Sequence, residues 1–184
     1  MSNGVVMIRR YRADDAPLLF EAARASLDEL SVWSSWCHPN YTPEESRAFV
    51  LSSETAWEQK AAFNFAVFDA GGRLFLGGVG LSKVNRGNKF ANLGYWVRSD
   101  QTGRGVATAA AVLAAEFGLR DLGLNRVEIL IAVGNAASRR VAEKAGAKKE
   151  GVLRSRILLH GRPHDAVMYS LVAADLRRDE AGGV

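Results

Sequence analysis

Residues Gln101–Thr108, with the sequence Gln-Thr-Gly-Arg-Gly-Val-Ala-Thr, separate two segments of different pattern. The preceding residues 93–97 are aromatic and β-branched, which indicates a strand, and apolar residues then recur at helical spacing from Val106 to Phe117. Two glycines at this junction leave backbone N–H groups uncovered, and the helix dipole places partial positive charge behind them. The sequence therefore predicts an anion-binding turn, in which Arg104 adds a charge suited to phosphate oxygens.

Two known glycine-rich phosphate motifs do not match this loop. A dinucleotide-binding GxGxxG pattern fails because Thr108 occupies its last position, and a Walker loop fails because no Gly-Lys-Ser/Thr follows. An ordinary strand-to-helix connection, in which glycine serves only the turn geometry, stays open. A short loop that holds a diphosphate through its backbone is the other interpretation.

Composition is typical of one globular domain. The chain has 184 residues, 48% of them hydrophobic and 24% charged, and we expect a domain over residues 1–175 with a frayed tail over residues 176–184. The single cysteine, Cys37, cannot form an internal disulfide and is expected to pack. Because the three histidines are scattered rather than at ligand spacing, we predict no metal site.

Charge and hydropathy limit the classes of ligand and partner that we expect. The net charge of +4 is mild, and the basic residues do not form the aromatic-interleaved stripe of a nucleic-acid binder. The charge fits an anionic small ligand at least as well, so we expect no direct nucleic-acid contact and keep a nucleic-acid binder only as a distant alternative. No apolar stretch approaches 18 residues, and the start lacks a basic segment ahead of an apolar run. We therefore expect a cytoplasmic protein without membrane contact.

The element order predicts a mixed α/β sheet. Helical patterns are expected in four regions, the first running from about Arg12 to Leu30 and the second beginning at the Thr-Pro-Glu-Glu capping sequence at Thr42. Strands are expected over residues 5–9, 63–68, 74–81, 90–97, 126–133, 151–159 and 166–172. The expected fold class is a mostly antiparallel sheet of about seven strands with about four helices.

Four fragments in this order and spacing resemble the Gcn5-related N-acetyltransferases (GNAT), in particular their RimJ/RimL-type branch, which acetylates protein N-termini. The resemblance covers nearly the whole chain. It rests on residues 93–97, residues 103–108, residues 135–138 with 143–146, and the closing Gly161-Arg162 with Asp165 and residues 169–171. The stretch from Trp33 to Glu45 is similar to the substrate-side region of that branch.

The resemblance implies a splayed central strand pair and acetyl-coenzyme A (acetyl-CoA) as co-substrate, with no metal. It implies that the pantetheine arm lies in the gap between the strands, where a backbone N–H faces the thioester oxygen and Asn135 contacts the arm from the opposite side. Ser138 falls at the family's position next to the departing sulfur and is the predicted catalytic residue. The implied coenzyme-binding residues are Trp96, Val97, Gly103, Arg104, Gly105, Val106, Ala107, Thr108, Asn135 and Ser138.

Several positions depart from the family pattern or carry two interpretations. Asn92 stands where related enzymes often have a glutamate, so the general base is unassigned; Glu128 is available, or it pairs with Arg126. Thr102 replaces the usual arginine or glutamine and is expected to cap the helix. Ser138 either hydrogen-bonds the sulfur or bonds the backbone of its own helix.

The acceptor side is implied by the resemblance to involve three aromatic residues: Trp33, Trp36 and Tyr95. Trp33 and Trp36 either line this site or belong to the core, and by frequency we expect at least one in the core.

The predicted function is direct acetyl transfer from acetyl-CoA to an amine, foremost a protein N-terminal α-amine. An acetyltransferase of a small amine, such as an antibiotic, a polyamine or an amino acid, is the second hypothesis. A non-catalytic acyl-CoA-binding regulatory domain is the third, motivated by Asn92. The oligomeric state is left open, a homodimer included.

Overall fold

Seven strands form one mixed sheet in the computed structural model, which describes residues 1–176. The strand order is β1-β2-β3-β4-β5-β7-β6. Only β4 and β5 pair in parallel among these neighbours, and all other pairs are antiparallel. The predicted fold class is confirmed. The strands are β1 (Val6–Arg10), β2 (Phe63–Asp69), β3 (Phe75–Asn85), β4 (Phe90–Val97), β5 (Arg126–Ala132), β6 (Lys148–Leu159) and β7 (Arg162–Leu171).

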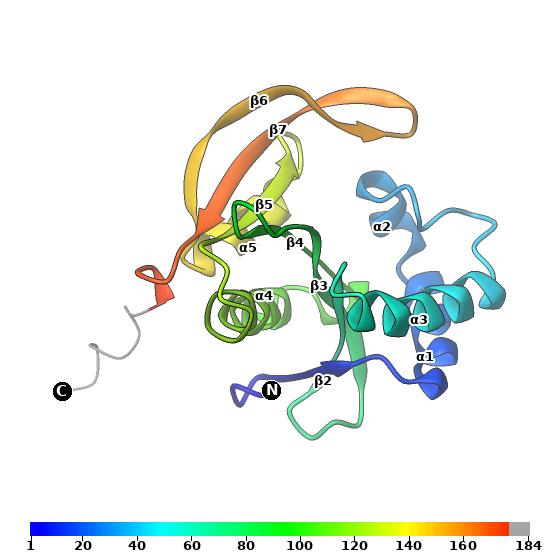
Figure 1. Cartoon of the computed structure of the whole chain (residues 1–184). Coiled ribbons are helices and arrows are strands. Elements are labelled where there is room, and N and C mark those ends of the chain that lie inside the picture. The colour runs from blue at the N-terminus through cyan, green and yellow to red at the C-terminus, as the bar shows by residue number, and fades with distance from the viewer. Residues whose placement is uncertain (177–184) are drawn as a thin grey trace.

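Helices cover both faces of this sheet, with α4 on one side and α1 and α3 on the other (Figure 1). Short 3-10 turns precede α1 and follow β4, and a π-helical turn continues α4. These elements are η1 (Ala13–Asp15), α1 (Ala16–Arg24), α2 (Leu27–Trp33), α3 (Pro43–Glu58), η2 (Ser99–Gln101), α4 (Val106–Glu116), η3 (Phe117–Asp121) and α5 (Ala136–Lys144).

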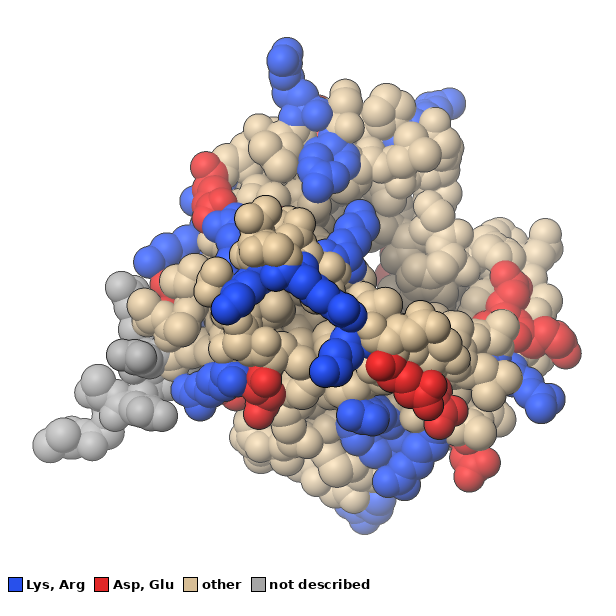
Figure 2. Space-filling view, viewed as in Figure 1, with Lys and Arg blue, Asp and Glu red and all other residues tan. Residues whose placement is uncertain are grey.

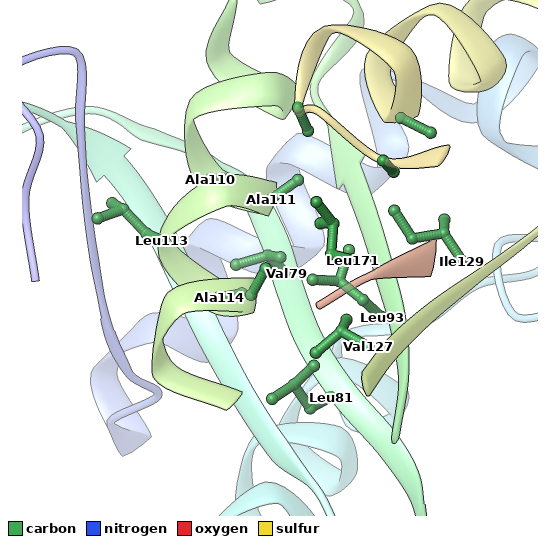
Figure 3. Packing of buried hydrophobic residues seen from close by; sticks show 14 of the residues in the cluster. Val79, Leu81, Leu93, Ala110, Ala111, Leu113, Ala114, Val127, Ile129 and Leu171 are labelled. Carbon is green, nitrogen blue, oxygen red and sulfur yellow. The ribbon is translucent and has the colours of Figure 1, made fainter. Parts of the chain in front are cut away.

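The main core lies between α4 and the sheet. Ala110, Ala111 and Ala114 of α4 are fully or nearly fully buried, and Figure 3 shows them beside Val79 of β3 and Leu93 of β4. Small side chains let a helix approach a sheet closely, which fixes where the helix begins relative to the strands. Replacing a buried leucine such as Leu93 by alanine would cost about 2–5 kcal/mol of stability.

The central strands β4 and β5 part soon after they meet. Their pairing covers only Phe90 with Arg126, Ala91 with Val127 and Asn92 with Glu128. Beyond this point the two strands have no ladder between them, although β4 continues to Val97 and β5 to Ala132. This parting is the splayed pair that the family resemblance implies.

The expected first helix is broken in two, which corrects the prediction of one helix to Leu30. Ser26, fully buried, donates its hydroxyl to the carbonyl of Ala22 (2.7 Å) and accepts the N–H of Ser99 (2.9 Å). A serine that bonds the preceding turn competes with the helical ladder, and here it also joins a residue 73 positions away. α1 therefore ends at Arg24 and α2 begins at Leu27.

Glycines in β3 admit close neighbours. Gly77 has φ +151°, and a Cβ there would collide with the carbonyl oxygen of Trp96. A Cβ on Gly78 would lie 2.7 Å from both the Trp96 indole nitrogen and the Tyr11 hydroxyl. β3 thus positions the Trp96 side chain, and it also extends four residues beyond its expected end, to Asn85.

From the sequence we expect neither a membrane-spanning helix nor a cluster of metal-binding side chains. Within residues 1–176, no helix has both the length and the apolar content to cross a membrane, and no group of three or more His, Cys, Asp or Glu side chains could hold a metal ion. Cys37 is buried, as expected. The predicted frayed tail lies outside the described residues except for Leu176.

Candidate active site

The glycine loop leaves a row of backbone amides open at the start of α4. Gly103 and Gly105 adopt φ values of +77° and +80°, and a Cβ on either would point into open space. α4 begins at Val106 without a side-chain cap. Within the described chain, the N–H groups from Gly103 through Thr108 have no hydrogen-bond partner. An uncovered helix start of this kind binds anions.

The structure corrects one sequence prediction at this loop and places the side chain of another residue. Thr102 does not cap α4, because its hydroxyl donates to the carbonyl of Ser99 (2.9 Å) and Gly105 occupies the N-cap position. The side chain of Arg104 is exposed, and Arg104 is absent from the residues that line the adjacent cavity. The backbone of the loop, rather than this guanidinium, forms the wall of the cleft.

A cavity of about 680 Å³, here called the cleft, runs from the glycine loop to the gap between the central strands. It brings together most of the predicted coenzyme-binding residues on α4, β4 and α5. Its lining includes Trp96, Val97, Gly103, Gly105, Val106, Ala107, Thr108, Asn135 and Ser138, together with Trp33 and Tyr95. A smaller cavity of about 160 Å³, lined by Gly94, Leu130 and other residues of β4 and β5, shares Trp33, Tyr95, Asn135 and Ser138 with it.

The backbone of β4 presents alternate residues to the gap. Arg98 donates its N–H to the carbonyl of Leu76 of β3. Because hydrogen-bonded pairs alternate along an antiparallel ladder, Trp96 also directs its N–H and C=O toward β3. Tyr95 and Val97 direct theirs toward the gap on the β5 side. The register therefore favours Val97 over Trp96 as the backbone donor inside the cleft.

Tyr95 of β4 reaches across the gap to α5. Its hydroxyl donates to the carbonyl of Ser138 (2.9 Å) and accepts the Ser138 hydroxyl (3.1 Å). Asn135 caps α5 by accepting the N–H of Ser138 (3.0 Å). Burial raises the pKa of Tyr95 to about 12, so this phenol is neutral at physiological pH.

The Ser138 hydroxyl therefore donates to Tyr95 in the lining of the cleft rather than to its own helix. The sequence had placed Tyr95 on the acceptor side and gave no indication that it holds Ser138. The contact joins two residues 43 positions apart, and no local pattern encodes it.

Neither tryptophan of the α2 region belongs to the core, which corrects the expectation for at least one of them. Trp33 is 39% exposed and Trp36 is 40% exposed. The Trp33 ring lies over the backbone of Gly134, where an added Cβ would be 3.1 Å from it, and so closes one end of the cleft. Trp36 packs instead on the indole of Trp96, with ring centroids 5.5 Å apart.

Trp36 and Trp96 belong to a separate cavity of about 530 Å³, which we call the aromatic pocket. It lies on the α1–α3 face of the sheet and adjoins the cleft, because Trp96 lines both. No sequence pattern predicts this pocket, although Trp36, Tyr41 and Glu45 belong to the stretch that resembles the substrate-side region of the family. Its lining residues are Leu19, Ser35, Trp36, His38, Tyr41, Glu45, Phe49 and Trp96.

The position of a general base has two possible occupants, and neither is a free carboxylate. Glu128 accepts from the Arg126 guanidinium (2.9 Å), which is the pairing that the sequence offered as an alternative. Asn92, its partner in the parallel ladder, has a buried side-chain oxygen without a hydrogen-bond partner in the described chain. An amide oxygen can orient a donor, but it does not take up a proton at neutral pH.

The groups that line the cleft are suited to binding a linear anionic ligand. Uncovered amides at α4 can hold a diphosphate, the parted strands can admit an extended chain, and the Val97 N–H with the Ser138 hydroxyl can contact a reacting centre. Comparison with known proteins agrees. An acetyltransferase (GNAT) domain model matches residues 6–148. The chain belongs to the GNAT acetyltransferase family.

The chain is also similar to individual acetyltransferases of known sequence or structure. The chain is 30% identical over 174 residues, 92% of each chain, to YdaF of Bacillus subtilis, which is provisionally named a ribosomal N-acetyltransferase. It is 28% identical over 119 residues to the ribosomal protein uS5-alanine N-acetyltransferase of Escherichia coli, covering 64% of this chain and 61% of the relative. The RimJ structure from Mycobacterium smegmatis, solved with CoA-disulfide, shares the fold with a TM-score of 0.86 at 24% identity, over 95% of this chain and 85% of that one.

Proposed function

We propose that this GNAT acetyltransferase moves the acetyl group of acetyl-CoA directly to a protein N-terminal α-amine. The observation that carries the proposal is the row of uncovered amides at α4, which opens into the gap between β4 and β5. The coenzyme's diphosphate would bind to the N–H groups of Gly103–Thr108, and its pantetheine arm would lie in the gap. The CoA-disulfide bound to the M. smegmatis RimJ supports this choice of co-substrate.

The reacting step needs no metal and no covalent enzyme intermediate. The amine nitrogen attacks the thioester carbonyl, a C–N bond forms, the C–S bond breaks and the sulfur leaves as thiolate. The proton that the nitrogen loses passes to the thiolate or to water. The Val97 N–H would stabilise the negative charge that develops on the carbonyl oxygen. The Ser138 hydroxyl, which donates to Tyr95 without ligand, would turn its one proton from the Tyr95 oxygen to the departing sulfur. Because a thiol has a pKa near 8.5, the sulfur leaves without a strong acid.

Neither residue at the general-base position is a free carboxylate, and this favours an α-amine acceptor over a lysine side chain. An α-amine with a pKa near 8 is about 10% neutral at pH 7, a penalty of about 1.4 kcal/mol, whereas lysine with a pKa near 10.4 requires about 4.6 kcal/mol. Glu128 is paired with Arg126, and Asn92 cannot act as a base. An acceptor that is partly neutral in solution is therefore the better match. The ribosomal names of the B. subtilis and E. coli relatives support a protein acceptor.

A small-molecule amine is the second candidate, and one observation favours it. The aromatic pocket has a volume of about 530 Å³, within the range of ligand pockets of about 300–1,000 Å³. Such an acceptor would use the same acetyl transfer.

The deciding experiment incubates the purified protein with acetyl-CoA and two panels of acceptors. One panel holds peptides that differ in their first three residues, and the other holds polyamines, amino acids and an aminoglycoside. We expect mass spectrometry to detect α-N-acetylated peptides. Rapid acetylation of a small amine without peptide turnover would overturn the protein acceptor, and coenzyme binding without turnover of any amine would favour a regulatory domain.

A further inference from the structure

We infer that the aromatic pocket binds the side chain of a lysine or arginine among the first three residues of the acceptor. This inference rests on the proposed function and adds the chemical class of the acceptor. It depends on three features: the position of the pocket beside the reacting centre, the chemistry of its walls, and the charge of the segment that forms it.

The aromatic pocket lies one residue from the proposed oxyanion donor. Trp96 precedes Val97 in β4, and successive side chains of a strand point to opposite faces of the sheet. Adjacent Cα atoms are about 3.8 Å apart. Trp96 lines both the cleft and the aromatic pocket, so the side chains of the first acceptor residues would fall within reach of the pocket on the α1–α3 face.

The walls of this pocket combine aromatic rings with one carboxylate. Trp36 packs on Trp96 and makes an edge contact with Tyr41 (centroids 5.7 Å apart), while Phe49 lines the same space. Glu45 is the one acidic residue in the lining. Aromatic faces attract cations, and Lys and Arg carry an apolar stem below a charged head. Both parts of such a side chain would find a partner here.

Glu45 is held in place as an anion. Its carboxylate accepts the N–H of Thr42 (2.9 Å) and lies 3.0 Å from the His38 ring nitrogen. These hydrogen bonds, that from Thr42 first, lower the pKa of Glu45, so the group is ionised at neutral pH. A carboxylate oxygen accepts more than one hydrogen bond, so a ligand cation can still be bound. An uncharged apolar side chain would instead shield this carboxylate from water without compensation.

The segment that forms the pocket is strongly acidic. Residues 13–58 contain nine Asp and Glu against two Lys and Arg, in a chain whose net charge is +4. Figure 2 shows most of the visible acidic side chains on the α1–α3 side, whereas basic side chains dominate the opposite side and the β6–β7 hairpin. A negative potential of this kind attracts a basic N-terminal segment and repels an acidic one.

The test is a peptide scan with the intact protein and acetyl-CoA. Eight-residue peptides with one constant background carry lysine, arginine, norleucine, glutamine or glutamate at position 1, 2 or 3 in turn. Norleucine keeps the apolar stem of lysine and lacks its charge. At one of these positions we expect kcat/KM for lysine or arginine to exceed that for norleucine about tenfold, which is 1.4 kcal/mol, and this ratio to fall as salt is raised.

Two variants locate the effect in the pocket. Glu45→Gln removes the charge but keeps an acceptor for the N–H of Thr42, so α3 stays capped, and we expect the lysine-to-norleucine ratio to fall to about twofold. Glu54→Gln is the matched control. It removes an exposed charge of the same helix outside the pocket, about 13 Å away along the axis and beyond a Debye length of about 8 Å, and we expect the ratio to be kept.

Trp36→Leu should lower the ratio through the loss of an aromatic face, and Trp36→Phe should restore part of it. Equal rates for lysine and norleucine at all three positions, a preference for glutamate, or an unchanged ratio in Glu45→Gln would overturn the inference while leaving peptide acetylation intact. Absence of turnover on every peptide would instead overturn the proposed function, and this inference with it.

Discussion

The proposed coenzyme side and the proposed acceptor side of the site consist of different parts of the chain, one mainly backbone and the other mainly side chains. The proposed coenzyme side consists of backbone: amides of Gly103–Thr108 and of Val97, positioned by a helix start and a strand edge. The proposed acceptor side consists of side chains from Leu19 to Phe49 that meet Trp96 only through tertiary packing. The difference teaches that an anionic ligand can be held largely by main chain that local sequence positions, whereas the proposed recognition of the acceptor depends on side chains brought together by tertiary packing.

The largest expected effect tests the backbone side of this comparison. Gly105→Val places a β-branched residue at φ +80° and a side chain over the open amides, so we expect the dissociation constant for CoA to rise about a hundredfold, or 2.7 kcal/mol. Isothermal titration calorimetry measures it. Gly123→Val is the control, since Gly123 also has a positive φ (+65°) but lies outside the cleft. Equal loss of affinity in both variants would mean that general strain, not the loop, is responsible.

The next effect concerns the bond that joins the two sides. Ser26→Ala removes the acceptor of the Ser99 N–H at the approach to the glycine loop and leaves that partly buried N–H unpaired. We expect a loss of about 1–3 kcal/mol in the free energy of unfolding, measured by urea denaturation. Ser52→Ala on the exposed face of α3 removes only a bond to a nearby carbonyl and should change stability by less than 0.5 kcal/mol. Equal stability of the two variants would argue against a structural joint at Ser26.

A smaller effect is expected at the reacting centre. Ser138→Ala should lower kcat about tenfold, or 1.4 kcal/mol, while the dissociation constant for CoA changes by less than about twofold, because the hydroxyl would act on the departing sulfur. Single-turnover kinetics with CoA titration separates the two quantities. An unchanged kcat would remove Ser138 from the site.

The smallest effect belongs to the residue that orients Ser138. Tyr95→Phe keeps the ring and loses the hydroxyl that bonds Ser138, so we expect kcat to fall about threefold. In the Tyr95→Phe, Ser138→Ala double variant the effects should not add, since both act through one hydrogen bond. Because the pKa of Tyr95 is raised to about 12, the wild-type rate should show no loss from Tyr95 ionisation below pH 10. Additive effects would assign Tyr95 a role independent of Ser138.

The same contrast explains what the sequence could predict. The strands and the glycine loop were predicted within a few residues, because strand patterning and the glycines at the positive φ of residues 103 and 105 are local properties. The family resemblance then supplied Ser138 and the gap between β4 and β5.

The errors arise where a contact joins distant parts of the chain. The break at Ser26 depends on Ser99, and the Ser138 hydroxyl is directed by Tyr95. Trp33 and Trp36 carry large apolar rings, for which burial is the usual outcome, yet each lines a cavity instead. The aromatic pocket could not be assembled from the sequence, since its residues belong to α1, the loop before α3, α3 and β4.

The central claim is that the amides at the start of α4 grip the diphosphate of the coenzyme, and amide-resolved nuclear magnetic resonance during a CoA titration tests it most directly. The account predicts that the N–H signals of Gly103–Thr108 shift most and that their hydrogen exchange slows when CoA binds. Saturable CoA binding that leaves these six signals in place would contradict it.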